Sequence, residues 1–280
     1  MMKKLGLIAG GGALPVELAE HCRQSGRPVF VIRLKGFAGP ELAPYAGAEV
    51  GIAELGKCFK ALKRAGCRVV CLVGNVDRPD FSALIPDLRG LAVLPAAIAA
   101  ARKGDDALLR LMVGEFEKEG FEVEGAHEVM DDLTLGAGPL GRCLPSTENQ
   151  ADAERALAVA RAIGELDVGQ AVAVCRGLVL AVEAQEGTDA MLARVAQLPE
   201  PLRGRPGACA GVLAKAPKPM QETRVDLPTI GPATVRAVAH AGLSGIVGEA
   251  GRLIVLDREA VIEQADELGV FILGVEPAGP

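Results

Sequence analysis

Short apolar runs alternate with amphipathic stretches along the first half of the chain. The runs at residues 5–9, 29–32 and 69–73 are continuous, which is typical of parallel strands that are buried on both faces. Apolar positions at helical spacing follow the first run as far as Gly26, and a second predicted helix covers residues 55–65. Strands that alternate with helices predict right-handed βαβ crossovers and a Rossmann-like parallel sheet.

The second half shows shorter apolar runs and more glycine. Thr147 and Gln150 have the spacing of a capping box, which predicts a helix from Thr147 to about residue 163. Strands are expected at residues 172–174, 178–182 and 211–215, with Arg176-Gly177 as a two-residue turn between the first two. The runs at residues 246–247 and 253–256 suggest a hairpin, because glycines lie between them.

These patterns together predict an α/β fold with two domains. An N-terminal Rossmann-like parallel-sheet domain is expected over residues 1–135, and a C-terminal α/β domain with a mixed sheet over residues 136–280. The boundary is placed in a stretch rich in Gly and Pro, residues 131–146.

Composition narrows the class of protein. Hydrophobic residues make up 50% of the chain but aromatic residues only 3%, so the core must consist mainly of Val, Leu, Ile and Ala. The net charge of −6 argues against a nucleic-acid partner, which usually requires a basic surface. The seven cysteines are scattered, which favours buried reduced thiols over disulfides or a zinc site.

The apolar runs are too short to cross a bilayer, and the N-terminal run is too short for a signal peptide. We therefore expect a cytoplasmic protein that can still touch a membrane surface.

A glycine turn, Gly10-Gly11-Gly12, follows the first predicted strand. Such a turn exposes N–H groups at a helix N-terminus, where they favour the phosphate of a ligand. Pro15 stands where the dinucleotide fingerprint requires glycine or alanine, which disfavours a nicotinamide oxidoreductase. Asn75 follows the third predicted strand, at the sheet edge where ligands bind. The alternatives are a tight turn for the glycines and a turn residue for Asn75.

A polar loop, Gln185-Glu186-Gly187-Thr188-Asp189, follows a predicted strand and precedes a helical pattern. Its side chains and the helix N-terminus can face a ligand. The alternative is that Thr188 or Asp189 only caps the helix.

The densest charged cluster lies between residues 215 and 226, where two prolines exclude a helix. Cations followed by a carboxylate suit pyrophosphate chemistry: the cations balance phosphate charge, and the carboxylate binds a metal or orients a water. An exposed charged loop is the alternative. The candidate residues are the substrate-binding Lys215, Lys218, Gln221, Thr223 and Arg224, and the catalytic and metal-binding Asp226.

Seven segments in a fixed order resemble the LpxI family, the UDP-2,3-diacylglucosamine pyrophosphatases of lipid A biosynthesis. They are LGLIAGGGALP at 5–15, VGNV at 73–76, RKGDD at 102–106, EGAH at 124–127, EAQEGTDAM at 183–191, KAPKP at 215–219 and DLPTIG at 226–231.

The resemblance implies hydrolysis of UDP-2,3-diacylglucosamine, a lipid-linked nucleotide sugar, to 2,3-diacylglucosamine 1-phosphate (lipid X) and UMP. It further implies Mg²⁺ as cofactor, Asp226 as the essential aspartate, and work at the cytoplasmic face of the inner membrane. A non-catalytic nucleotide- or lipid-binding protein remains the alternative.

Overall fold

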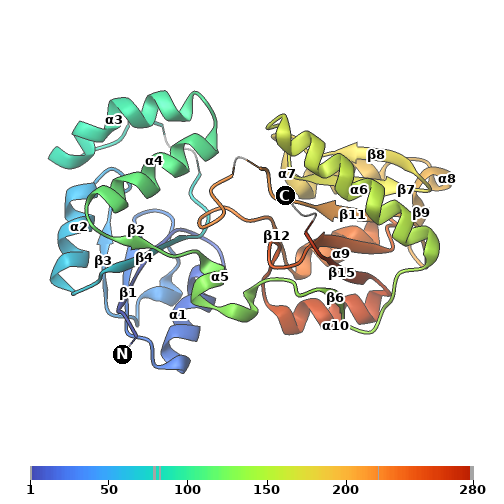
Figure 1. Cartoon of the computed structure of the whole chain (residues 1–280), viewed down its shortest axis with the longest axis horizontal. Helices are drawn as coiled ribbons and strands as arrows, with labels where there is room; N and C mark the ends of the chain where they lie inside the picture. Colours follow the sequence, from blue (N-terminus) through green and yellow to red (C-terminus); the bar gives the residue numbers. More distant parts are fainter. Residues whose placement is uncertain (1, 78–79, 82, 220, 278–280) are drawn as a thin grey trace. The chain divides into compact units, whose positions relative to one another are not determined.

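The computed structural model describes residues 2–77, 80–81, 83–219 and 221–277. The chain forms two compact units (Figure 1). The first consists of Met1–Asp131 together with Glu222–Asp226, and the second of Asp132–Gln221 and Leu227–Pro280. The predicted α/β class, with a parallel sheet first and a mixed sheet second, is confirmed. Residues 222–226, which the sequence pattern assigned to the second domain, pack with the first unit.

Five parallel strands form the centre of the first unit in the order β3-β2-β1-β4-β5. Every residue of the central β1 is buried, as its continuous apolar run requires. The pattern did not predict β3 and β5, since each is short and contains an exposed glutamate. The strands are β1 (Leu5–Ala9), β2 (Val29–Leu34), β3 (Gly47–Val50), β4 (Val69–Val73) and β5 (Glu122–Val123).

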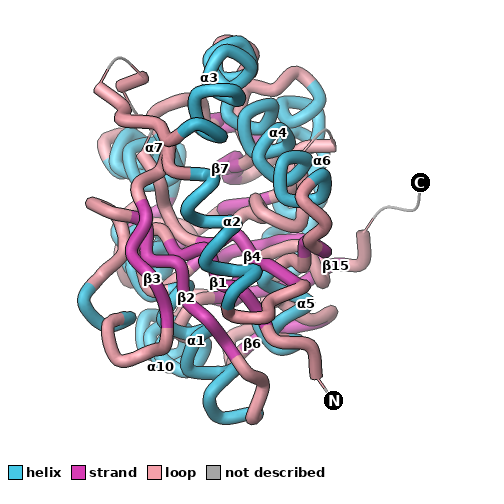
Figure 2. The backbone as a smooth tube through the Cα atoms, turned by 90° about the vertical axis from the view of Figure 1, so that its left-hand side faces the viewer, coloured by secondary structure: helices cyan, strands magenta, loops and turns pink. Residues whose placement is uncertain are grey.

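Helices cover both faces of this sheet (Figures 1 and 2). On one face, α2, α3 and α4 share an apolar core with the strands, and Phe59 and Phe116 meet edge to face with ring centroids 5.1 Å apart. On the other face, α1 and α5 contact each other. The helices are α1 (Leu14–Ser25), α2 (Leu55–Arg64), α3 (Leu88–Ala101), α4 (Asp105–Lys118) and α5 (Ala126–Val129), with 3-10 turns at Pro40–Leu42 and Asp131–Leu133.

The second unit contains a six-stranded mixed sheet in the order β6-β15-β13-β11-β7-β8. Its strands β15, β13 and β11 are mutually parallel, β6 and β7 run antiparallel to them, and the edge strand β8 runs antiparallel to β7. Arg176 and Gly177 form the predicted two-residue turn, with φ of 49° and 73°, as a type I′ turn requires. The strands are β6 (Gly138–Leu140), β7 (Ala171–Cys175), β8 (Leu178–Val182), β11 (Val212–Lys215), β13 (Gly245–Glu249) and β15 (Phe271–Val275).

Strand alternation divides the core of this unit between two layers of helices. Val172 and Val174 of β7 face α6, whereas Ala171 and Ala173 face the core that α7, α9 and α10 complete. These helices are α6 (Thr147–Glu165), α7 (Gly187–Ala196), α9 (Pro232–His240) and α10 (Arg258–Leu268), with a short α8 at Glu200–Arg203.

Two local predictions are wrong. The runs near residues 246 and 254 do not form a hairpin: β13 pairs in parallel with β11 and β15, and β14 (Ile254–Val255) pairs with β12 (Thr229–Ile230) in a separate parallel ribbon. A small antiparallel ribbon, β9 (Gly204–Arg205) with β10 (Ala208–Cys209), completes the strands.

The second wrong prediction is the cap of α6. Ser146 rather than Thr147 caps this helix, since the Ser146 hydroxyl accepts the N–H of Asn149 at 3.2 Å.

Candidate functional site

The glycine turn pairs with the chain that follows β4. Gly11 and Asn75 exchange two backbone hydrogen bonds, each 2.8 Å long, and the N–H of Gly10 donates to the carbonyl of Val73 at 2.8 Å. A Cβ on Gly10 would lie 2.6 Å from the Asn75 carbonyl oxygen. Glycine is therefore required here by close backbone approach, and the turn brings the candidates Gly10–12 and Asn75 together.

This pairing narrows how the turn can bind a ligand. The N–H groups of Gly10 and Gly11 are used within the protein, so a phosphate would meet Gly12 and the first turn of α1. The side chain of Asn75 points to the same place: a Cβ on Gly12 would lie 3.6 Å from its amide nitrogen.

Gly74 provides a test of this packing. Its φ is +93°, and a Cβ there would lie 2.6 Å from the carbonyl oxygen of Gly11. We expect Gly74→Ala to lower the free energy of unfolding by about 2 kcal/mol, because backbone atoms must move. Denaturant unfolding measures this.

The matched control is Gly114→Ala inside α4, where a Cβ would meet nothing within 4 Å. That variant should gain about 0.5–1 kcal/mol, because alanine is the better helix former. Equal stability of the two variants would contradict the proposed crowding at Gly74.

The segment Glu222–Asp226 is held on the first unit by polar contacts. The N–H of Glu222 donates to Asp106 Oδ1 at 2.9 Å, at the start of α4. Arg224 donates to both carboxylate oxygens of Glu222, at 2.8 and 2.9 Å, and to Glu117 Oε1 at 2.8 Å. Val225 packs against the core of this unit. These contacts hold Asp226 on the unit that also contains the glycine turn and Asn75.

The strand order places the glycine turn, Asn75 and the segment Glu222–Asp226 at one edge of the parallel sheet. The carboxyl ends of β1, β4 and β5 lead into Gly10, Gly74 and Glu124, and a Cβ on the next residue, Gly125, would lie 3.1 Å from Arg224 Cα. Ligands of open parallel sheets bind at this edge.

Charge around Arg224 is balanced within the segment. Hydrogen bonds from Arg224 lower the pKa of Glu222, and the bonds to Glu222 and Glu117 raise the pKa of Arg224 still further. The Arg224 guanidinium thus has two carboxylate partners, and we infer that it holds the segment Glu222–Asp226 in place. Direct contact of Arg224 with a substrate phosphate stays a prediction.

Lys215 lies in a buried polar network of the second unit. Its side chain is 5% exposed, and Nζ donates to Thr188 Oγ1 at 2.9 Å and to the Thr229 carbonyl at 3.0 Å. The Thr188 hydroxyl in turn donates to Glu183 Oε1 at 2.6 Å. Two candidates from distant segments, Lys215 and Thr188, are therefore brought together at the end of β11 and the start of α7.

The other residues of the polar loop face outward. Gln185, Glu186 and Asp189 are exposed, and Gly187 adopts a φ of +79°. A hydrogen bond from its own backbone N–H, and then one from Arg194, lower the pKa of Glu186. Thr188 is thus the member of this loop that joins the Lys215 network.

Lys218 and Gln221 belong to the second unit, and Thr223 is exposed on the first. Lys218 Nζ pairs with Asp167 Oδ1 at 2.8 Å. Gln221 is 8% exposed and closes a turn, since its Oε1 accepts the Lys218 N–H at 3.0 Å. The three predicted cations therefore have different surroundings: Lys215 is buried, Lys218 forms a surface ion pair, and Arg224 is bound by carboxylates.

Most of the cysteines are buried as reduced thiols. All seven cysteines lie among the described residues as free thiols. Burial raises the pKa of Cys58 to about 12 and raises those of Cys22 and Cys71 as well, which disfavours the reactive thiolate. The prediction of buried reduced thiols is confirmed for the buried ones, and Cys143 and Cys209 are half-buried.

Comparison with known proteins places both units in one family. The LpxI N-terminal domain matches residues 4–133, and the LpxI C-terminal domain matches residues 136–273. The chain belongs to the LpxI family. A Caulobacter vibrioides protein described as UDP-2,3-diacylglucosamine pyrophosphatase LpxI is 68% identical over 276 residues, which cover 99% of each chain.

Two solved structures of other proteins resemble this LpxI-family chain weakly. The CobK precorrin-6A reductase gives a TM-score of 0.32 at 15% identity, covering 100% of this chain and 90% of its own. N5-carboxyaminoimidazole ribonucleotide synthetase from Thermotoga maritima gives 0.26 at 13% identity, covering 65% and 42%. These similarities are too low to carry an argument about function.

Several polar residues that contact the candidate residues were not selected from the sequence. Asp106 and Glu183 lie inside the quoted segments RKGDD and EAQEGTDAM, but no pattern in the sequence gave them a partner. Glu117 lies on α4 and reads as an ordinary surface charge until Arg224 reaches it. Their positions in the sequence could have indicated them, since Glu183 directly follows a predicted strand and Asp106 lies in the first turn of a helix.

Proposed function

We propose that this chain hydrolyses the pyrophosphate bond of UDP-2,3-diacylglucosamine, giving UMP and 2,3-diacylglucosamine 1-phosphate. The relative of that name, 68% identical over 99% of both chains, is the observation that carries the proposal. In the reaction, the oxygen of water forms a bond to one phosphorus and the bridging P–O bond breaks. Each product keeps one phosphate, and one proton is released.

Asp226 is the proposed catalytic residue. Its segment is fixed on the unit whose parallel sheet carries the glycine turn, and the backbone N–H of Asp226 donates to the Glu222 carbonyl at 3.0 Å. A half-buried carboxylate held in this way can orient a water for attack in line with the leaving phosphate. Gly12 and Asn75 supply hydrogen-bond donors for the nucleotide sugar.

Lys215 and Lys218 are the proposed cations for phosphate charge. The Nζ of Lys215 is oriented by Thr188 and by the carbonyl of Thr229, which fixes its direction before substrate arrives. A preorganised ammonium in a poorly solvated place stabilises developing negative charge more strongly than one in water. Lys218 would exchange its exposed partner Asp167 for phosphate.

We propose Mg²⁺ as the cofactor, with Asp226 as its protein ligand. Among the described residues, no three His, Cys, Asp or Glu side chains gather into a metal cage. Mg²⁺ commonly binds through one or two carboxylates together with substrate phosphates and waters, so a single aspartate is a sufficient protein ligand for this proposal. Bound there, the ion would offset the charge of the pyrophosphate.

The proposed reaction is tested by incubating the chain with UDP-2,3-diacylglucosamine in isotopically labelled water, with and without magnesium. We expect equal amounts of UMP and 2,3-diacylglucosamine 1-phosphate, with the label in only one of them. Magnesium removal should abolish the release of both. Saturable UDP binding without UMP release would support the non-catalytic binding protein instead.

A further inference from the structure

The exposed face of α3 is apolar along its whole length. Residues 90–101 contain no polar or charged side chain. Leu88 is 90% exposed and Leu91 56% exposed, and Ile85 just before the helix is 85% exposed. The exposed residues Ala92, Pro95, Ala96 and Ala99 continue the same side at helical spacing. A helix on the surface of a globular unit normally turns polar residues to water, so this face is suited to an apolar environment.

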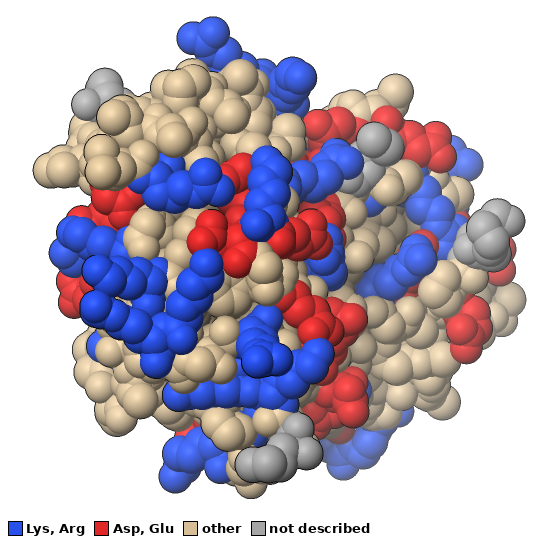
Figure 3. Space-filling view, turned by 60° about the vertical axis from the view of Figure 1, so that its left-hand side comes forward, with Lys and Arg blue, Asp and Glu red and all other residues tan. Residues whose placement is uncertain are grey.

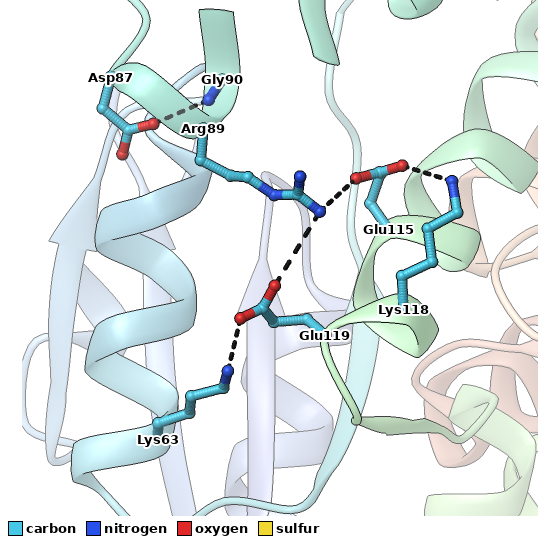
Figure 4. Close-up of polar contacts among 7 residues, drawn as sticks. All are labelled: Lys63, Asp87, Arg89, Gly90, Glu115, Lys118 and Glu119. Carbon is cyan, nitrogen blue, oxygen red and sulfur yellow. Dashed lines mark hydrogen bonds and ion pairs between the residues drawn. The ribbon is translucent and has the colours of Figure 1, made fainter. Parts of the chain in front are cut away.

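Polar contacts at its first turn fix α3 in place (Figure 4). Asp87 caps the helix by accepting the Gly90 N–H at 2.8 Å, and its other oxygen accepts the N–H of Lys57 on α2. Arg89 pairs with Glu115 of α4 at 2.9 Å and reaches Glu119 at 4.0 Å. Val93 and Ala97 form the buried side. The apolar face is therefore held in one orientation.

Basic side chains border this face. Neither α2 nor α3 contains an acidic residue. Exposed Arg102 and Lys103 follow α3 directly. On α2, Lys60 and Arg64 are exposed, whereas Lys57 pairs with Glu54 and Lys63 pairs with Glu119 of α4. Figure 3 shows an uncharged area over α3 in its upper part, with blue side chains gathered below it and red side chains among them. An apolar face bordered by cations matches a bilayer with anionic headgroups.

We propose that α3 is the membrane-docking element of this chain, with Leu88 and Leu91 entering the headgroup region of an anionic phospholipid bilayer. The choice of occupant rests on the proposed function, because a substrate with two acyl chains resides in a membrane. Among the described residues, no helix is long and apolar enough to cross a bilayer. The helix lies on the surface, and the cations hold it against the headgroups.

The test measures binding of the full chain to vesicles without substrate, so it does not depend on catalysis. Phosphatidylethanolamine vesicles with and without phosphatidylglycerol are mixed with the chain and floated. The wild type should bind the anionic vesicles, and Leu88→Glu/Leu91→Glu should bind on the order of tenfold more weakly. The matched control is Leu166→Glu in the second unit, where the leucine is 75% exposed; it should bind like the wild type.

Two further variants separate the contributions. Leu88→Glu alone alters the most exposed leucine of the face and should not disturb the fold. It therefore tests the docking even if the double variant fails to fold. Arg102→Gln/Lys103→Gln should weaken binding only to vesicles that contain phosphatidylglycerol, and added salt should remove the difference.

Three results would overturn docking by α3: wild-type chain that does not float with anionic vesicles, equal floating of the Leu88 variants, or a wild-type dimer that these variants convert to a monomer. The last would assign the face to a second copy of the chain. Loss of hydrolysis with vesicle binding intact would instead reject the proposed function alone.

Discussion

Asp226→Asn should lower kcat by about 10³-fold, because asparagine keeps the shape of the side chain but can neither accept the proton of the attacking water nor supply a carboxylate to a cation. The fold should be unaffected, since the segment is held by Glu222, Arg224 and Val225 rather than by this side chain alone. Steady-state release of UMP, measured beside thermal unfolding, checks both parts.

The matched control for this prediction is Asp132→Asn, which removes the same charge from an exposed position. Its turnover should equal that of the wild type. If the Asp226 variant retained normal turnover, the catalytic assignment would be lost, whatever the stability of the protein. A fall in melting temperature that matched the loss of activity would instead give Asp226 a structural role.

Arg224→Ala should lower kcat by about 10²-fold, while UMP binds nearly as tightly as before. The guanidinium joins Glu222 to Glu117 of α4, so its removal frees the segment that carries Asp226. Misplacement of a catalytic group by about 1 Å is enough for a loss of this size. Arg236→Ala, on the exposed side of α9, is the matched control.

Glu117→Ala separates the holding of the segment from contact with phosphate. If Arg224 positions Asp226, Glu117→Ala should also lower kcat. Arg224→Lys should then retain a higher kcat than Arg224→Ala. If Arg224 instead binds phosphate, Glu117→Ala would leave kcat unchanged or raise it, and Arg224→Ala would weaken UMP binding. These two patterns do not overlap.

The pH dependence of this ion pair has a definite sign. The pKa of Glu222 is lowered by Arg224, so the pair contributes its full stabilisation above the ordinary carboxyl pKa. The contribution is lost only as the pH falls through the lowered folded-state value. The segment should therefore stay in place at neutral pH.

Much of the fold could be predicted from the sequence because burial leaves a clear pattern. The continuous apolar strands β1, β2 and β4 were readable, since a parallel strand with helices on both faces has no polar side. The helix α3 was not predicted, because Pro95 interrupts an apolar run that lacks helical periodicity. Its apolar exposed face is the reason that the periodicity is missing.

The candidate site was predictable in its residue types and not in its connections. Lys215 and Thr188 were selected separately, and only the pairing of β11 with β7 and the start of α7 bring them together. Conversely, Arg224 reads as a cation for phosphate, whereas the fold gives it two carboxylates from α4 and its own segment. Long-range partners of charged residues leave no local signal.

The chain gives the segment Glu222–Asp226 to the first unit and then returns to the second. The two halves of the gene are consequently not two independent modules. A fragment that ends at Asp131 would lack the strip of chain that covers Gly125 and the start of α4, and a fragment that begins at Asp132 would carry Asp226 on an unsupported loop. Activity in a mixture of the two fragments would require that loop to bind across a broken chain. Insertions and truncations in this protein should thus be planned around residues 222–226 as well as around the linker near residue 131.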